Sequence, residues 1–371
     1  MASDTAPAEV FPPGDFLREE LEARGWSQIE FAEILGRPVR LVNEIIAGKK
    51  RITPETAKEL AAALGTSPDI WLNLETAYRL GQAEPASSRI ARRAKLRERC
   101  PMREMMNRGW IEHSENLDVL ENQVVRFFGV KSLDERPELA YAAKQTAYEG
   151  PLSPAQEAWL VRVKRIAEGL PVAPYTEGGL RDALPRLHAL LGEPEEIRHV
   201  PRILAEAGVR FVVVEWLPST KIDGVCFWLD ENSPVVGMSL RFDRVDNFWF
   251  VLRHEIEHVL RRDGTILDSE LEKTNDNLSN QERIANAAAA DFCVPTAALD
   301  DFMARVRPLF SDERIKAFAL SIGVHPGLVA GQLRRRLERY DLFVKHLVKV
   351  RHIIIPNAVT DGFGQALQIA V

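Results

Sequence analysis

The sequence predicts an α+β fold: a helical N-terminal part, a helical middle part, and a C-terminal part in which a small sheet is joined to helices. Two observations lead to this prediction. Apolar residues recur every three or four positions from residue 14 to 80, and apolar runs with strand-like spacing begin after Glu196. The chain has 371 residues, which is enough for two or three domains. With 46% apolar and 27% charged residues, its composition is that of a globular protein.

Charge and cysteine content narrow the class of protein. The net charge of -6 excludes a uniformly basic nucleic-acid coat, so any DNA contact has to be local. Three scattered cysteines provide neither a disulfide framework nor a cysteine-rich zinc knuckle. The N-terminal residues lack the pattern of a signal peptide, and no apolar stretch approaches the roughly 18 residues of a membrane span. We therefore expect a cytoplasmic protein without membrane contacts.

Glycines and polar stretches divide the chain into three predicted regions. Residues 1–85 are expected as a helical domain, because glycines separate short helices up to residue 80 and a small, polar stretch follows. Residues 86–195 are interpreted as a helical connector, which opens with a basic run at 89–103. That run is either a solvated helix face or an additional phosphate contact. Residues 196–371 form the third region.

The third region is expected to contain an antiparallel sheet. Strands are predicted at 209–216, 225–229 and 235–240, with turn residues between them, and the simplest pairing is a meander. A late strand is predicted at 352–355. The strand at 235–240 is expected to be an edge that holds an extended substrate by backbone pairing.

A motif for metal binding lies in a helix predicted over 246–262. Its sequence is His254-Glu255-Ile256-Glu257-His258. Histidines four residues apart project from one face of a helix, so both imidazoles can reach one zinc ion at ~2.0–2.1 Å. Glu255 would then take a proton from the water that attacks a peptide carbonyl. The alternative is a pair of histidines on a solvated helix face.

A catalytic zinc needs a third protein ligand, for which the candidate is Glu282 at the start of a helix predicted over 281–292. Asn286, one turn later, would support a ligating histidine. The segment 279–282 also has the sequence of a capping box, in which Glu282 would only bond the backbone amide of Ser279. The sequence leaves both interpretations open.

These motifs resemble the ImmA/IrrE metallopeptidase family over about residues 196 to 340. The resemblance implies a zincin-like domain with a small, mostly antiparallel sheet and a zinc endopeptidase activity that cuts a repressor or antitoxin-like regulator. It implies Zn2+ ligands and a general base at His254, His258, Glu282 and Glu255. Glu257 departs from the family pattern, in which Gly or Ala is usual. Its carboxylate either lies in solvent on the other face of the helix or crowds the site electrostatically.

A second motif occupies residues 26–50, where Ser27 is a good N-cap and Gly36 makes a tight turn between two short helices. Outward positions on the second helix are expected to meet base edges, which Arg and Asn side chains can read: Val39, Arg40 and Asn43. Three further polar residues are placed to meet phosphates: Gln28, Lys49 and Lys50.

Residues 12–80 resemble the HigA-type (XRE) helix-turn-helix antitoxin domain. The resemblance implies a homodimer that binds operator DNA and often a toxin partner. Glu44 departs from the pattern by placing an acid near the DNA. A helical protein-binding or dimerisation module is the alternative.

Two functions fit the sequence. The first is a DNA-binding regulator or antitoxin that carries a zinc endopeptidase acting on a regulator protein. The second is a DNA-binding antitoxin or repressor whose peptidase-like domain is catalytically silent and serves as a sensor or partner-binding surface. The ligand set and general base favour the first, because a domain that only binds partners has no physical need for them.

Overall fold

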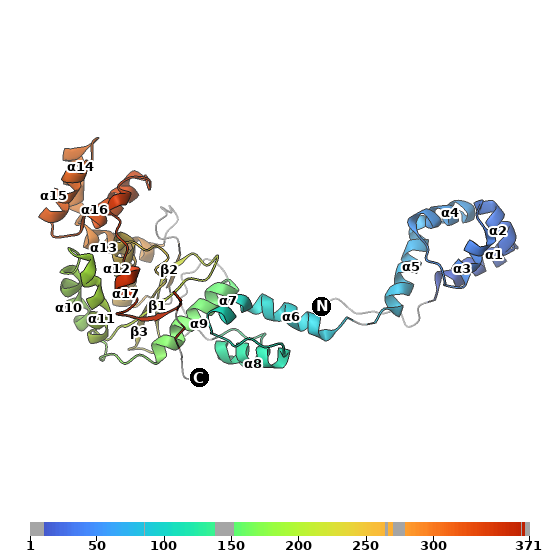
Figure 1. The fold of residues 1–371 in the computed structure, drawn as a ribbon, viewed down its shortest axis with the longest axis horizontal. Helices are drawn as coiled ribbons and strands as arrows, with labels where there is room; N and C mark the ends of the chain where they lie inside the picture. Colours follow the sequence, from blue (N-terminus) through green and yellow to red (C-terminus); the bar gives the residue numbers. More distant parts are fainter. Residues whose placement is uncertain are drawn as a thin grey trace. The chain divides into compact units, whose positions relative to one another are not determined.

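The structure, a computed structural model, describes residues 11–84, 86–137, 152–263, 266–269, 279–364 and 366–367. The chain divides into two compact units, Met1–Ser88 and Arg89–Val371 (Figure 1). The connector expected at 86–195 lies in the second unit from residue 89 onward. Among the described residues, no helix is long and apolar enough to cross a membrane.

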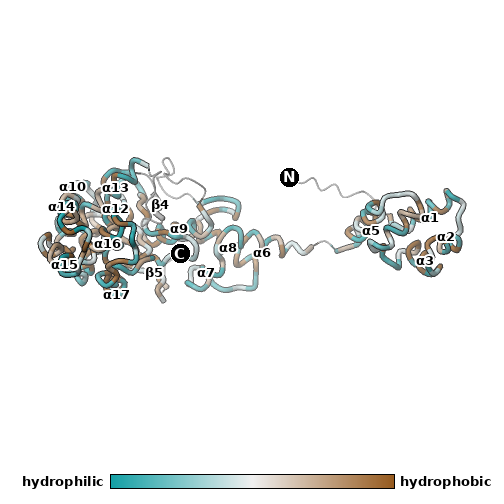
Figure 2. Tube along the Cα trace, turned by 90° about the horizontal axis from the view of Figure 1, so that it is seen from above, coloured by the Kyte–Doolittle hydropathy of each residue, from teal (hydrophilic) through white to brown (hydrophobic). Residues whose placement is uncertain are grey.

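The described part of the first unit consists of five helices. They are α1 (Pro13–Arg24), α2 (Gln28–Leu35), α3 (Val39–Ile46), α4 (Pro54–Leu64) and α5 (Pro68–Gln82). Hydrophobic and hydrophilic residues alternate along them (Figure 2), and the hydrophobic ones form a single core around Phe31, Leu60 and Trp71. Helix α1 lies close to the end of α3, since a Cβ atom on Gly14 would be 2.5 Å from the carbonyl oxygens of Ile45 and Ile46.

The second unit combines helices with one mixed sheet. Its α-helices are α6 (Ser88–Arg99), α7 (Met102–Asn107), α8 (Leu117–Phe128), α9 (Pro154–Glu168), α10 (Glu177–His188), α11 (Val200–Glu206), α12 (Val245–Arg261), α13 (Asn280–Cys293), α14 (Thr296–Val306), α15 (Asp312–Ser321), α16 (Pro326–Leu337) and α17 (Arg351–Ile354). Two 3-10 helices are η1 (Pro194–His199) and η2 (Val344–His346). The strands are β1 (Arg210–Val214), β2 (Ile222–Trp228), β3 (Pro234–Met238), β4 (Ile266–Ser269) and β5 (Val359–Asp361).

The strand order β4-β2-β3-β1-β5 corrects the predicted meander. Strands β2 and β3 form the expected antiparallel hairpin, but β1 pairs in parallel with β3 and with β5. The expectation that β3 is an edge strand is therefore wrong, and in the described sheet β4 and β5 form the edges. The predicted strand at 352–355 is also wrong, because the short helix α17 lies there and β5 follows it.

Strand β1 lies inside the sheet because both of its faces are apolar and buried. Phe211 and Val213 belong to one hydrophobic core, and Val212 and Val214 belong to another. Helix α12 contacts β2 and β3, whereas α9 contacts β1 and β3 (Figure 1). The helices expected as a connector thus cover one face of the sheet and share its core.

Candidate metal centre and nucleic-acid interface

Helix α12 is buried on nearly all sides, because it packs against β2, β3, α13 and α16. His254 and His258 both have an exposed fraction of 0%. The alternative of two histidines on a solvated helix face is therefore wrong. Buried imidazoles need polar partners, and the partners lie on α13 and at the end of α12.

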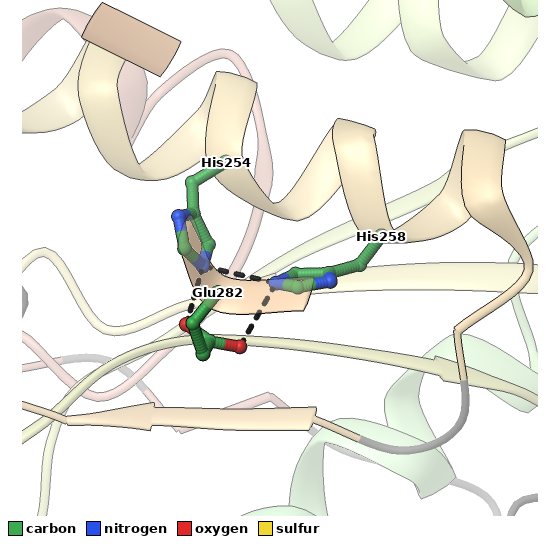
Figure 3. Close-up of side chains that lie close together, drawn as sticks. All are labelled: His254, His258 and Glu282. Carbon is green, nitrogen blue, oxygen red and sulfur yellow. Dashed lines mark hydrogen bonds and ion pairs between the residues drawn. The ribbon is translucent and has the colours of Figure 1, made fainter. Parts of the chain in front are cut away.

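Glu282 at the start of α13 faces the two histidines (Figure 3). Its carboxylate oxygens lie 3.3 Å from Nε2 of His254 and 3.3 Å from Nε2 of His258. Ser279 caps α13 by accepting a hydrogen bond from the backbone amide of Glu282, at 3.2 Å. The reciprocal bond of a capping box is not formed, since the Glu282 side chain turns to the histidines instead.

The three side chains bring their ligand atoms within 4.8 Å of one another, with the two Nε2 atoms 3.0 Å apart. Burial alone would raise the pKa of Glu282, but hydrogen bonds and charges from His254 and His258 outweigh it and hold that pKa well below its usual range. Two imidazoles and one ionised carboxylate are a donor set that suits a divalent ion such as zinc. The residues present therefore fit a metal.

Asp263 is a member of this site that sequence reasoning missed. Its carboxylate lies 2.9 Å from Nδ1 of His258 and accepts a hydrogen bond from the Gln281 amide at 3.0 Å. Arg262, with φ 52°, ends α12 in the left-handed conformation and turns the chain back under the helix. The sequence feature that could have identified it is an acidic residue five positions after the second histidine, just beyond the end of the predicted helix.

Asn286 lies on α13, half-buried, one turn after Glu282. Within the described part of the chain, its side-chain oxygen is buried without a hydrogen-bond partner, so the expected bond to a histidine is not formed. Asp263 supports His258 in its place.

Glu255 is fully buried between the two histidines in sequence. Its carboxylate lies against β2, where a Cβ atom on Gly224 would be 2.1 Å from Oε1. The strand predicted at 225–229 begins earlier, at Ile222, so Gly224 lies inside β2. Only a glycine leaves room for the carboxylate at this point of the strand.

The expectation that the Glu257 carboxylate lies in solvent is wrong, because Arg253 holds it in an ion pair. The Glu257 carboxylate accepts a hydrogen bond from Nη2 of Arg253 at 2.8 Å, one turn earlier on α12. The ion pair is largely buried, with exposed side-chain fractions of 10% and 16%. The extra negative charge is therefore neutralised by Arg253.

In the first unit, α2 and α3 are joined by a turn at Gly36, whose φ is 62°. Five of the residues expected to contact phosphates or bases are exposed to solvent: Gln28, Arg40, Asn43, Lys49 and Lys50. Val39 differs from the expectation: it is half-buried because its side chain packs against the core. Arg40 Nε donates a hydrogen bond to Glu44 at 2.7 Å, so the acid of this helix engages the arginine expected to read bases.

The basic run at 89–103 supplies ion pairs within the second unit. Arg92, Lys95 and Arg99 bind carboxylates of α8, the following loop and α9, respectively. The other basic residues of the run, Arg89, Arg93, Arg97 and Arg103, are exposed, which agrees with the solvated-face interpretation, and the phosphate contact stays a prediction.

Comparison with known proteins identifies the first unit. The helix-turn-helix family profile matches residues 17–71. The HTH-type transcriptional regulator YddM of Escherichia coli is 38% identical over 72 residues, which are 19% of this chain and 77% of that protein. The chain belongs to the helix-turn-helix family. Virulence-associated protein I of Dichelobacter nodosus is 40% identical to it over 73 residues, 19% of this chain and 68% of that protein.

Among solved structures, the helix-turn-helix unit is similar to an addiction module antidote protein of a HigA family from Coxiella burnetii. The identity is 38%, the match covers 20% of this chain and 83% of that chain, and the TM-score is 0.20. The family profile ends at residue 71, so the site formed by His254, His258 and Glu282, the histidine–glutamate site, lies outside it. Membership of the second unit in the ImmA/IrrE family stays a prediction from its motifs.

Proposed function

We propose that this helix-turn-helix protein is an antitoxin-like transcriptional regulator that binds operator DNA and carries a zinc-dependent endopeptidase in its second unit. The protein substrate would be a regulator of the repressor or antitoxin kind. The observation that supports the peptidase is the convergence of His254, His258 and Glu282 beside the buried Glu255.

Each residue has a defined role in this proposal. His254, His258 and Glu282 would hold zinc, which when bound supplies a Lewis acid that polarises a peptide carbonyl. Glu255 would act as general base, taking a proton from the attacking water and passing it to the leaving amine. Gly224 leaves room for the Glu255 carboxylate beside β2. An extended substrate would add by backbone pairing to β4, which forms an edge of the described sheet beside β2.

A catalytically silent sensor domain is the competing function. The feature that favoured a silent domain was Glu257, because a negative charge close to the metal site would impair catalysis. The Arg253–Glu257 ion pair removes that reason, so the enzyme is preferred.

Metal binding is tested with two substitutions at the start of α13. Glu282→Gln should lower zinc affinity, because a neutral amide is a poorer ligand than a carboxylate. Ser279→Ala removes the helix cap instead and should cost about 1 kcal/mol of stability with zinc affinity retained. Zinc content after competition with a chelator separates the two. Full zinc affinity in Glu282→Gln would remove the third ligand from the proposal.

Cleavage is tested with the matched pair of wild type and Glu255→Gln. The substitution keeps the volume and the metal ligands, so the fold and zinc content should persist while cleavage falls roughly 10²–10⁴-fold. The substrates are a regulator encoded beside this protein and the chain's own segment 82–88, each with and without zinc. Equal processing by both proteins would make the silent regulator the preferred function.

DNA reading is tested on α3. Arg40→Ala or Asn43→Ala should each cost about 1–3 kcal/mol on a specific operator, because each removes a base contact. Lys49→Ala should weaken binding to all sequences alike and flatten the salt dependence. Unchanged operator affinity in the Arg40→Ala, Asn43→Ala double variant would assign the unit to protein binding.

A further inference from the structure

A pocket lies among α7, α8, α9 and the segment 366–367. None of the residues that line it belongs to the site of His254, His258 and Glu282. The volume of the pocket is about 610 Å³. Small-molecule sites usually have volumes of about 300–1,000 Å³, so the pocket is large enough for a metabolite-sized ligand. The pocket lies on the side of the sheet that α9 covers. The proposed peptidase mechanism does not involve it.

Two buried aromatic rings line one side of the pocket, with exposed fractions of 8% for Trp110 and 3% for Phe127. The rings of Trp110 and Phe127 stack with their centroids 5.8 Å apart and their planes 11° apart. The guanidinium of Arg162 lies 5.6 Å from the Trp110 ring, and that of Arg165 lies 5.7 Å from the Phe127 ring. The faces of the two rings are thus covered by one another and by the guanidinium groups, and a flat organic ligand in the pocket would meet their edges.

The pocket also has an excess of positive charge. Its lining includes Arg126, Arg162 and Arg165 but only one acid, Glu112. Arg162 is neutralised by the buried Asp361, whose oxygens lie 2.8 and 2.9 Å from it. Among the residues that the structure describes, no carboxylate forms an ion pair with Arg126 or Arg165.

Arg165 donates a hydrogen bond to the backbone carbonyl oxygen of Arg126, but this partner carries no negative charge. The side chain of Arg165 is half-buried, and burial, together with the charges of Arg162 and Arg126, lowers its pKa despite the opposing charge of Glu168. A cation that is partly desolvated beside other cations is unfavourable unless an anion joins it. A bound anion would supply the missing charge and could accept a forked pair of hydrogen bonds from a guanidinium.

We propose that this pocket binds a small organic anion whose phosphate or carboxylate group meets Arg126 and Arg165 and whose flat body packs beside Trp110 and Phe127. Trp110 and Arg162 both also bond Asp361 of β5. The ligand would therefore contact residues that anchor an edge of the sheet.

Isothermal titration calorimetry on the full-length chain tests the site, with AMP, benzoate, phenyl phosphate, inorganic phosphate and neutral adenosine as probes. AMP or benzoate should bind at one site per chain and at least about tenfold more tightly than adenosine, because only the anions satisfy the arginines. Phenyl phosphate and benzoate share the same ring, so the tighter of these two identifies the head group as phosphate or carboxylate. Inorganic phosphate should bind more weakly than AMP because it lacks the flat body.

Substitutions place the binding in this pocket. Arg165→Gln and Arg126→Gln should each weaken binding by about tenfold or more. Arg126 is exposed, so its variant reports on charge even if loss of Arg165 disturbs packing over Phe127. Arg93→Gln, at an exposed arginine of α6, makes the same charge change outside the pocket and should bind as wild type does. The proposal is overturned if none of the organic anions binds more tightly than adenosine, or if Arg126→Gln binds like Arg93→Gln.

Discussion

Asp263 holds His258 by two contacts. Its backbone amide donates to the His258 carbonyl oxygen at 3.0 Å, and its carboxylate meets Nδ1 at 2.9 Å. With Nδ1 engaged, Nε2 is the nitrogen that faces His254 and Glu282. An outer carboxylate of this kind fixes the orientation and tautomer of a ligating imidazole.

Replacing Asp263 with Ala should therefore lower metal affinity by about 10–100-fold while the three ligands remain. Competition for zinc with a chromophoric chelator measures the effect. Asp300→Ala, at an exposed acid on α14, is the control for loss of one negative charge. If the two variants hold zinc equally well, Asp263 does not position the ligand.

Gly224 and Glu255 form a second residue-scale pair. Gly224→Ala would place a methyl group 2.1 Å from Oε1 of Glu255 and 2.9 Å from Cγ1 of Val251, so it should lower the unfolding free energy by about 1–3 kcal/mol. Glu255→Ala in the same chain should recover part of that loss. Gly178→Ala meets no atom within 4 Å and should leave stability unchanged or slightly raised. Denaturant unfolding measures wild type, Gly224→Ala, Glu255→Ala, the double variant and Gly178→Ala. Additive losses in the double variant would contradict the contact.

At the scale of the element, α3 presents Arg40 in an ion pair with Glu44, one turn later. The arginine has to leave this pair to bind a base edge. Glu44→Gln removes the competing charge and its repulsion of phosphates, so operator affinity should rise, most of all at low salt. Glu33→Gln on the exposed surface of α2 controls for net charge. Equal gains in both variants, measured by fluorescence anisotropy, would show that only net charge matters.

His325 caps the start of helix α16, since its Nδ1 accepts a hydrogen bond from the backbone amide of Gly327 at 3.0 Å. Burial lowers the pKa of His325 below its ordinary value of 6.5. As pH falls through about 6.5, the unfolded chain gains a proton on this group before the folded chain does, so its contribution to stability is lost on acidification. The cap also needs the neutral ring.

His325→Asn keeps a capping side chain that does not titrate. Its unfolding free energy should therefore fall less steeply between pH 7 and 5 than that of wild type. Chemical denaturation at a series of pH values gives the two slopes. Parallel slopes would mean that protonation of His325 does not contribute.

At the scale of the whole molecule, the two compact units should respond separately to substitutions in their cores. Gly14→Ala places a methyl group 2.5 Å from backbone oxygens of α3, which cannot move aside as a side chain can, and should lower only the transition of the first unit. Gly224→Ala should lower only that of the second. Differential scanning calorimetry of the full chain shows which of the two unfolding transitions each substitution lowers. A single transition that shifts in both variants would indicate that the units unfold together.

The sequence by itself determined the local features of this protein. The helix around His254 and His258 was predicted over 246–262 and is found as Val245–Arg261, and the helix of Glu282 was predicted over 281–292 and is found as Asn280–Cys293. The two short helices joined at Gly36 were also recognised. Periodicity, caps and turn residues act within a few positions of the chain, so they can be read without tertiary context.

Tertiary structure decided what depends on residues far apart. Strand order was one such feature, because apolar runs in β1 and β3 show that both strands are buried without showing which strands lie beside them. The direction of the Glu282 carboxylate was another, since the capping amide and the histidines are both within reach of the same side chain and only the packing of α13 on α12 brings the histidines close. Asp263, Gly224 and the Arg253–Glu257 pair depend on that packing as well. Long-range pairing is set by the sum of burial and charge over the whole fold, which a local pattern does not contain.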